Sequence, residues 1–293
     1  MKAKILKTII GLAIIVMVSI LLIIAYFMLV DIQTKMPRQN EYTCKVEAKQ
    51  FMGRNIFIIT PNNVEKANLT ILYFHGGSYM AEATQNHWEF LENLVNDTGA
   101  TIIFPDYPLS PKYSYKDVFR MVVPLYKEII DHIEAENLVI MGDSAGGGLG
   151  LALEEKLCEE NIEMPNKTIL ISPWLDVKLT NPEIDEVQKF DKQLNKETLK
   201  LAGLAYARED GIDSYLVNPI EGDLSKLKNV IIYTGTYDIL NPDVHILQKK
   251  AEEQGIEIQV KEYEKASHIW IIQNEEDEKE LVQKAYNDLV NDL

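Results

Sequence analysis

Residues 139–153 read VIMGDSAGGGLGLAL, an apolar run, a serine between small residues, and a second apolar run with helical character. The segment Gly142-Asp143-Ser144-Ala145-Gly146 fits the G-x-S-x-G pattern of a serine carried on a sharp strand-to-helix turn. Glycines flank such a serine because the tight turn crowds the backbone, and only a residue without Cβ relieves the contact. A dinucleotide-binding loop is disfavoured because the stretch lacks a clean G-x-G-x-x-G.

The chain around this stretch alternates short strand-like runs with longer helical patterns. Runs such as 138–141 (LVIM) and 230–235 (VIIYTG) are apolar throughout, as expected for strands covered by helices on both faces of a parallel sheet. The sequence therefore predicts an α/β fold with a mostly parallel, doubly wound sheet. Residues 177–226 interrupt the alternation with a polar, partly helical insertion, which predicts a helical cap.

A serine hydroxyl becomes nucleophilic only when a neighbouring base takes its proton, so Ser144 predicts an acid and a histidine later in the chain. Asp238 follows the strand-like run 230–235, and His268 follows the run 256–263. Both positions lie at the carboxyl ends of predicted strands, where ligands bind in such sheets. Asp243 is a rival acid but resembles a helix-start residue, and the rival histidines, His132 and His245, fall within helical patterns.

Acyl transfer also needs donors for the negative charge that develops on the carbonyl oxygen. His75-Gly76-Gly77 follows the strand-like run 69–74, where an HGG-type loop directs backbone N–H groups at the substrate. We therefore predict an oxyanion hole formed by the N–H groups of Gly76, Gly77 and Ala145. A simple glycine turn is the alternative.

Six segments, HGGS, DYPLSP, GDSAGGG, SPWLD, YDIL and SHIW, stand in the order and rough spacing of a known family. Across residues 68–290 the chain resembles the hormone-sensitive-lipase-like branch of the α/β hydrolases. The resemblance implies carboxylester hydrolysis without a metal or an organic cofactor, and a cap over an acyl pocket. The chain departs from the family pattern in three places. Ser78 replaces a third glycine, and DYPLSPK lacks an Arg and a Glu that form an internal ion pair in the family. Ile269-Trp270 follows the histidine where the family often has Gly-Phe.

Residues 8–30 carry no charged side chain, and a helix of that length spans about 35 Å, enough to cross a bilayer. We predict a basic tail at 1–7, a transmembrane anchor at 8–30, a stalk or cap start at 31–50 and a catalytic domain at 51–293. A cleaved signal peptide is the alternative, but its apolar core would be shorter. Retention of the short tail inside the cell predicts a single-pass membrane protein with an extracytoplasmic domain.

Charge and cysteine content limit the partners. The protein has a net charge of -16, and beyond residue 40 it carries 24 Lys and Arg against 44 Asp and Glu. Such a surface repels phosphate backbones, so we expect no nucleic-acid partner. Cys44 and Cys158 show no metal-ligand spacing, so we expect no metal site and favour free thiols over a disulfide.

Together these features predict a membrane-anchored serine esterase that hydrolyses short-acyl, acetyl-type esters. Two alternatives remain, a lipase that acts on longer acyl chains and a catalytically inactive ligand-binding protein of the same fold. The retained Ser144, Asp238 and His268 disfavour the inactive form. The sequence leaves the oligomeric state open.

Overall fold

A computed structural model describes residues 29–38, 42–62, 65–273 and 278–293, together with 12, 16–19, 22 and 26. The predicted basic tail, 1–7, lies outside the described residues, as does most of the predicted anchor, 8–30. Within the part that is described, no helix has both the length and the apolar character needed to cross a bilayer. The anchor therefore stays a prediction.

Eight strands form one sheet in the order β1-β2-β4-β3-β5-β6-β7-β8. The six strands from β4 to β8 in this order are parallel to one another, whereas β1 and β2 are antiparallel to their neighbours. This confirms the α/β fold with a mostly parallel sheet. The strands are β1 Lys45–Phe51, β2 Arg54–Thr60, β3 Thr70–Phe74, β4 Thr101–Pro105, β5 Leu138–Asp143, β6 Lys167–Ile171, β7 Val230–Gly235 and β8 Ile258–Tyr263.

Helices cover both faces of the sheet. One face packs against α2 (Gln85–Thr98), α8 (Trp270–Gln273) and α9 (Lys279–Asp292). The other packs against α3 (Tyr115–Ile130), α4 (Ser144–Glu159) and α7 (Asn241–Glu253). In β5, Val139 and Met141 face the first layer, whereas Leu138 and Ile140 face the second. Since side chains alternate between two buried faces, the central strands are apolar at every position.

The sheet begins earlier than predicted. β1 pairs with β2 through seven residue pairs from Lys45 to Phe51, so the boundary placed at residue 51 is wrong. β1 lies at the sheet edge, and most of its side chains are exposed. A charged edge strand discourages pairing with other chains, and it also lacks the apolar run by which a strand is found in a sequence.

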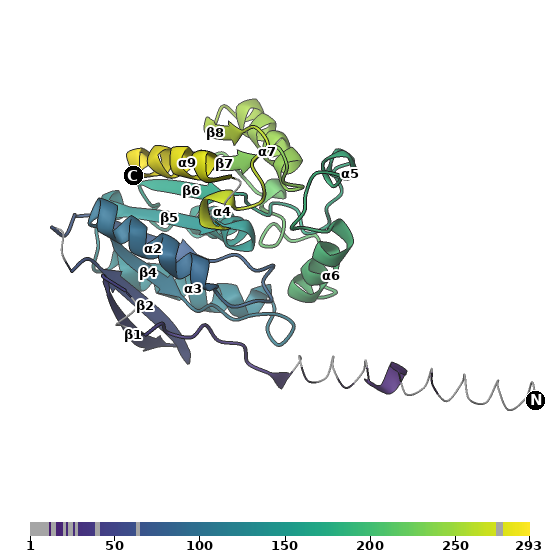
Figure 1. Cartoon of the computed structure of the whole chain (residues 1–293), viewed down its shortest axis with the longest axis horizontal. Coiled ribbons are helices and arrows are strands. Elements are labelled where there is room, and N and C mark those ends of the chain that lie inside the picture. The colour runs from purple at the N-terminus through teal and green to yellow at the C-terminus, as the bar shows by residue number, and fades with distance from the viewer. Residues whose placement is uncertain are drawn as a thin grey trace, which may run out of the picture.

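The segment between β6 and β7 contains the predicted cap insertion. It holds α5 (Ile184–Val187), α6 (Lys196–Ala207) and the short helix η3 (Pro219–Glu221), while another short helix, η2 (Ala135–Asn137), precedes β5. Asn195 caps α6 by accepting a hydrogen bond from the N–H of Thr198. α5 and α6 lie at the end of the body toward which the parallel strands point (Figure 1).

Residues 31–34 are bound to the body and do not form a loose stalk. The Arg54 guanidinium, from β2, lies 2.6 Å from Asp31 and 3.1 Å from Asp106. The N–H of Thr34 donates to Asp106 (2.8 Å). The DYPLSP segment lacks the Arg and the Glu of the family pattern, but β2 supplies a different cation to it, because Arg54 pairs with Asp106.

The two cysteines are buried thiols. Cys44 packs on the α2 face of the sheet, whereas Cys158 lies in α4 on the opposite face. No disulfide joins them, in agreement with the prediction.

Candidate active site

Ser144 sits at the junction of β5 and α4, with no residue between strand and helix. Its φ is 52°, in the left-handed region that few side-chain-bearing residues adopt. A Cβ on Gly142 would lie 2.5 Å from the carbonyl oxygen of Gly146, and one on Gly146 would collide with the backbone of Phe74. The glycines therefore let strand, turn and helix approach closely enough to present the serine at the sheet edge.

The structure brings Ser144, His268 and Asp238 together from three loops. Nε2 of His268 lies 3.0 Å from Oγ of Ser144, and Nδ1 lies 2.8 Å from Oδ2 of Asp238. Asp238 follows β7 and His268 follows β8, so neighbouring parallel strands deliver both groups to the same edge. All three side chains are buried, and Oδ1 of Asp238 also accepts the N–H of Leu240 (2.9 Å).

The rival residues lie elsewhere. His132 is exposed, with Nδ1 2.9 Å from the carbonyl oxygen of Glu128. His245 is paired with Glu262 at 2.7 Å. Asp243 is buried in the first turn of α7, and burial raises its pKa to about 7. Of the two candidate acids, only Asp238 contacts His268.

Charges around His268 set its protonation. Burial by itself lowers the pKa of His268, but the Asp238 carboxylate at Nδ1 outweighs this effect and holds the pKa above its usual value. Asp191 and Asp143 act in the same direction. The imidazolium is therefore favoured to a higher pH than in a free histidine.

This shift predicts the pH dependence of catalysis. His268 accepts a proton only when neutral, so kcat/KM is expected to fall as the pH decreases through its pKa. Because that pKa is raised, the midpoint of the acid limb is expected above the reference value of about 6.5. Initial rates on phenyl acetate across the pH range check this. A profile that stays flat between about pH 4 and pH 8 contradicts the assignment of His268 as the base.

Asp143, the residue before the serine, holds the HGG loop. Its buried carboxylate accepts hydrogen bonds from the N–H of Gly76 (3.0 Å) and the hydroxyl of Tyr73 (2.7 Å). Nε2 of His87 lies 3.3 Å away. Burial by itself raises the pKa of Asp143, but His87 and the hydrogen bond from Tyr73 hold this pKa below its usual value. The expected role of Gly76 is corrected, because its N–H is already bound to Asp143.

The N–H groups of the next two residues of the HGG loop are available to a substrate oxygen. Gly77, Ser78 and Tyr79 all have positive φ, of 110°, 55° and 60°, so the chain reverses sharply after His75. In the part of the chain that the structure describes, the N–H groups of Gly77 and Ser78 donate to no protein acceptor. The N–H of Ala145 lies in the first turn of α4, where helices have no internal acceptor. These three groups are the available oxyanion donors.

A comparison with known proteins identifies the family. Residues 71–272 match the family described as having the alpha/beta hydrolase fold. The chain belongs to the α/β-hydrolase family. The matched range runs from β3 past β8 and includes the loops that carry Ser144, Asp238 and His268.

Individual relatives of this α/β hydrolase are esterases and lipases. It is 30% identical over 200 residues to an esterase of Acinetobacter venetianus, which covers 67% of this chain and 66% of that protein. It is 26% identical over 204 residues to an acetyl-hydrolase of Streptomyces hygroscopicus, which covers 69% and 68%. The crystal structure of a hormone-sensitive lipase from a metagenome library has the same fold, with a TM-score of 0.79 and 23% identity over 87% and 86% of the chains. The matches confirm the expected family and support carboxylic ester hydrolysis.

The segment after α5 contacts the two loops that carry Asp238 and His268. Asp191 accepts the N–H of Ile239 (3.0 Å), the residue after Asp238. The side-chain amide of Gln193 donates to Ser267 (3.2 Å), the residue before His268. These positioning contacts were missed from the sequence because a polar insertion carries no local sign of what it touches.

Aromatic side chains join the hydrolase's cap to its HGG loop. Tyr206 of α6 stacks on Tyr79 with ring centroids 3.7 Å apart, and Trp174 also stacks on Tyr79, with centroids 5.7 Å apart. The His75 ring stacks on Tyr107, whose hydroxyl donates a hydrogen bond to the His75 carbonyl oxygen (2.6 Å). The loop and α6 therefore form one packed unit.

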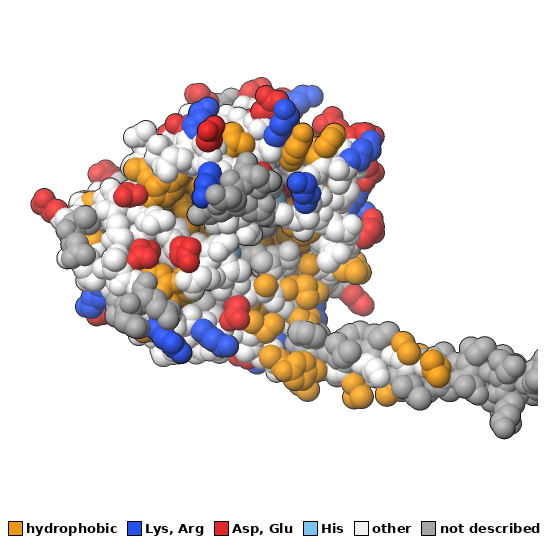
Figure 2. Space-filling view, in the orientation of Figure 1, with side chains coloured by type: hydrophobic (Ala, Val, Ile, Leu, Met, Phe, Trp, Pro, Cys, Tyr) orange, Lys and Arg blue, Asp and Glu red, His pale blue; other side chains and the backbone are white. Residues whose placement is uncertain are grey.

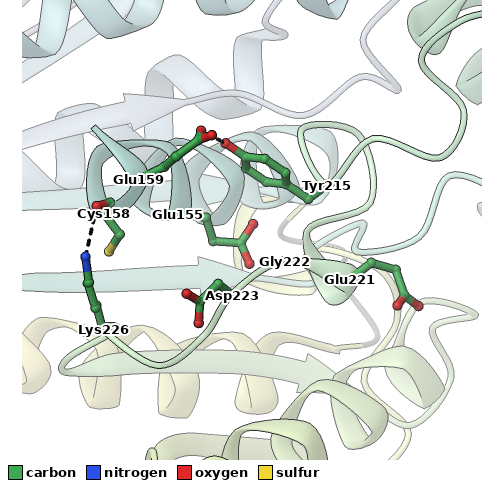
Figure 3. A pocket seen from close by; sticks show the side chains of 8 residues that line it. All are labelled: Glu155, Cys158, Glu159, Tyr215, Glu221, Gly222, Asp223 and Lys226. Atoms are coloured by element: carbon green, nitrogen blue, oxygen red, sulfur yellow. Dashed lines mark hydrogen bonds between the residues drawn. The ribbon is translucent and has the colours of Figure 1, made fainter. Parts of the chain in front are cut away.

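A separate pocket of about 270 Å³ lies at the far end of α4 (Figure 3). Both carboxylate oxygens of Glu155 lack a hydrogen-bond partner within the described chain, and burial raises its pKa well above the usual value, which favours the neutral acid. Glu155 is eleven residues from Ser144, or roughly 16 Å along the helix. The pocket lining includes neither serine nor histidine, so it is distinct from the Ser144–His268 site.

Proposed function

We propose that the protein is a membrane-anchored serine carboxylesterase that hydrolyses short-acyl, acetyl-type esters. The observation that carries this proposal is the hydrogen-bonded series from Ser144 Oγ to His268 Nε2 (3.0 Å) and from His268 Nδ1 to Asp238 (2.8 Å). This arrangement lets the imidazole take the serine proton while the carboxylate stabilises the resulting cation.

In the first half-reaction, Ser144 Oγ attacks the ester carbonyl carbon and its proton passes to Nε2 of His268. The carbonyl oxygen becomes an oxyanion that accepts hydrogen bonds from the N–H groups of Gly77, Ser78 and Ala145. When the tetrahedral intermediate collapses, the bond to the alcohol oxygen breaks and His268 returns the proton to it. The products are an acyl-serine and a free alcohol.

In the second half-reaction, water replaces the alcohol. His268 removes a proton from the water as it attacks the acyl carbon, and the same oxyanion donors act again. Collapse returns the proton to Ser144 and releases the carboxylic acid. Asp238 keeps Nδ1 protonated throughout, so that Nε2 faces Ser144 as an acceptor in the resting enzyme.

The anchor is supported by the sequence, and the short acyl group by a relative and by one residue of the HGG loop. The 23 uncharged residues at 8–30 support the anchor, and retention of the short basic tail favours an extracytoplasmic domain. A short acyl group is supported by the acetyl-hydrolase relative. Ser78 also favours a short acyl group, because it adds a side chain to the HGG loop where the family pattern has a third glycine.

Phenyl acetate, butyrate and octanoate distinguish the candidate functions. We expect the detergent-solubilised full chain to hydrolyse the acetate and butyrate with kcat/KM about tenfold or more above that of the octanoate, since an overfilled pocket loses contacts in the transition state. Steady-state rates measure this ratio. A preference for octanoate would instead establish the lipase, and a folded chain that neither turns over an ester nor reacts with a fluorophosphonate would establish the ligand-binding alternative.

A further inference from the structure

The residue that follows the predicted anchor is ion-paired to the body. Asp31 comes directly after Val30, the last residue of the apolar run. Its carboxylate lies 2.6 Å from Arg54 and 3.3 Å from Lys112, and it accepts the hydroxyl of Tyr113 (3.1 Å). No flexible spacer therefore separates the anchor from the folded body.

This attachment lies at the cap end of the molecule. The segment 31–38 leaves the body on the side where α6 lies (Figure 1). Contacts link the two, because the backbone carbonyl of Lys112, next to Asp31, accepts a hydrogen bond from Arg208 at the end of α6 (3.4 Å). One extended residue spans only about 3.5 Å, so a bilayer that holds Val30 must lie against this end of the body.

α6 presents leucines outward at the same end. Leu199, Ala202 and Tyr206 pack into the core, whereas Leu201 and Leu204, one turn apart, are 68% and 53% exposed. We call Leu201 and Leu204 the cap face. Apolar side chains gather on the side of the body where α6 lies and where the N-terminal segment leaves (Figure 2).

We propose that the cap face docks on the bilayer surface and that the enzyme's substrates are acetyl-type esters of long apolar alcohols, which partition into that bilayer. The proposal rests on the proposed anchor and esterase activity. We favour a lipid surface as the partner of the cap face, because the attachment at Asp31 holds the body next to the bilayer. No comparable contact holds a second copy of the protein next to the cap face in the part of the chain that the structure describes. Exposed leucines at a lipid surface bury apolar area, in the manner of an interfacial helix.

The enclosure of the active site fits this substrate class. Ser144 is 3% exposed and His268 is 4% exposed, so both groups lie beneath the surface of the body. The same helix that offers leucines on its outer side contributes Tyr206, which stacks on the HGG loop, on its inner side. An apolar alcohol chain can therefore stay in lipid near α6 while its ester end enters the site.

Depth-dependent quenching tests the docking. Full-length Leu204→Cys, labelled with an environment-sensitive fluorophore and reconstituted in phosphatidylcholine vesicles, is expected to be quenched by nitroxide-labelled lipid at least about twofold more than labelled Ile246→Cys. Ile246 is the control because it is also exposed (37%) but lies in α7, beside β8, at the sheet edge opposite the strand that binds Asp31. The native cysteines are buried and compete poorly for the label.

Kinetics on two acetates test the substrate class. In the same vesicles, the double variant Leu201→Ser with Leu204→Ser is expected to hydrolyse hexadecyl acetate about tenfold more slowly than the wild type, because two docking side chains lose their apolar surface. Hydrolysis of water-soluble phenyl acetate is expected to change less than about twofold, since the acyl group and catalytic centre are the same. Ile246→Ser should leave both rates unchanged.

The outcomes separate this proposal from the esterase assignment. Phenyl acetate hydrolysis without extra quenching at position 204 overturns the docking and leaves the esterase intact. Extra quenching without hydrolysis of either acetate overturns the esterase and leaves the docking intact. Equal losses on both acetates in the double variant, or label protection at position 204 that rises with protein concentration, also overturn the docking, the latter in favour of a second copy.

Discussion

Replacing Ser144 with alanine is expected to lower kcat on phenyl acetate by about 10⁶, with the protein still folded. The substitution removes the hydroxyl oxygen that lies 3.0 Å from Nε2 of His268 and with it the acyl-enzyme route. Alanine should fit, because Ser144 is followed at once by a helix and a smaller side chain adds no contact. Single-turnover and steady-state rates in detergent measure the loss.

Ser172→Ala is the matched control for this variant. Ser172 is a buried serine after the neighbouring strand β6, and like Ser144 it has a positive φ, of 47°. Its hydroxyl accepts the N–H of Ile269 (3.1 Å) and is not the group bonded to Nε2 of His268. Fluorophosphonate should therefore label wild type and Ser172→Ala but not Ser144→Ala. Undiminished labelling of Ser144→Ala would overturn the assignment of the nucleophile.

Asp238→Asn is expected to lower kcat by about 10⁴. Asp238 accepts the Nδ1–H of His268, and it also accepts the N–H of Leu240, so the asparagine oxygen will tend to keep the backbone contact. The amide NH₂ then faces Nδ1 and favours the tautomer with the proton on Nε2. That nitrogen becomes a donor toward Ser144 and can no longer take its proton.

The same variant should move the acid limb of the pH profile downward. The Asp238 carboxylate is the main influence that raises the pKa of His268 against burial, so its neutralisation lets burial lower that pKa. Asp243→Asn serves as the control, since Asp243 is equally buried but does not contact His268, and its kcat should fall less than about threefold. If Asp243→Asn were the more damaging variant, the acid would have been misassigned.

Much of the fold follows from local sequence patterns. The apolar runs at 138–141 and 230–235 lie within β5 and β7, because a strand buried on both faces must be apolar at every position. β1 escaped prediction for the opposite reason. It is an exposed edge strand, and its existence depends on pairing with β2.

The residues of the site likewise fall into those that local sequence patterns predict and those that depend on long-range contacts. Chain order and strand ends were enough to place Ser144, Asp238 and His268 at one sheet edge, since a doubly wound fold brings the ends of parallel strands together. The bond from Asp143 to Gly76, 67 positions apart, could not be foreseen because x in G-x-S-x-G is formally unrestricted. Asp191 and Arg54 escaped for the same reason, as both act through long-range contacts with backbone groups.

The attachment of residues 31–34 determines where a soluble fragment should begin. Removal of the first 40 residues discards Asp31 and Thr34, which contact Arg54 and Asp106. Tyr107, the neighbour of Asp106, donates its hydroxyl to the His75 carbonyl oxygen and so supports the HGG loop. A fragment intended for crystallisation or assay should therefore start no later than Asp31, because a shorter fragment loses contacts next to Tyr107, the residue that supports the HGG loop.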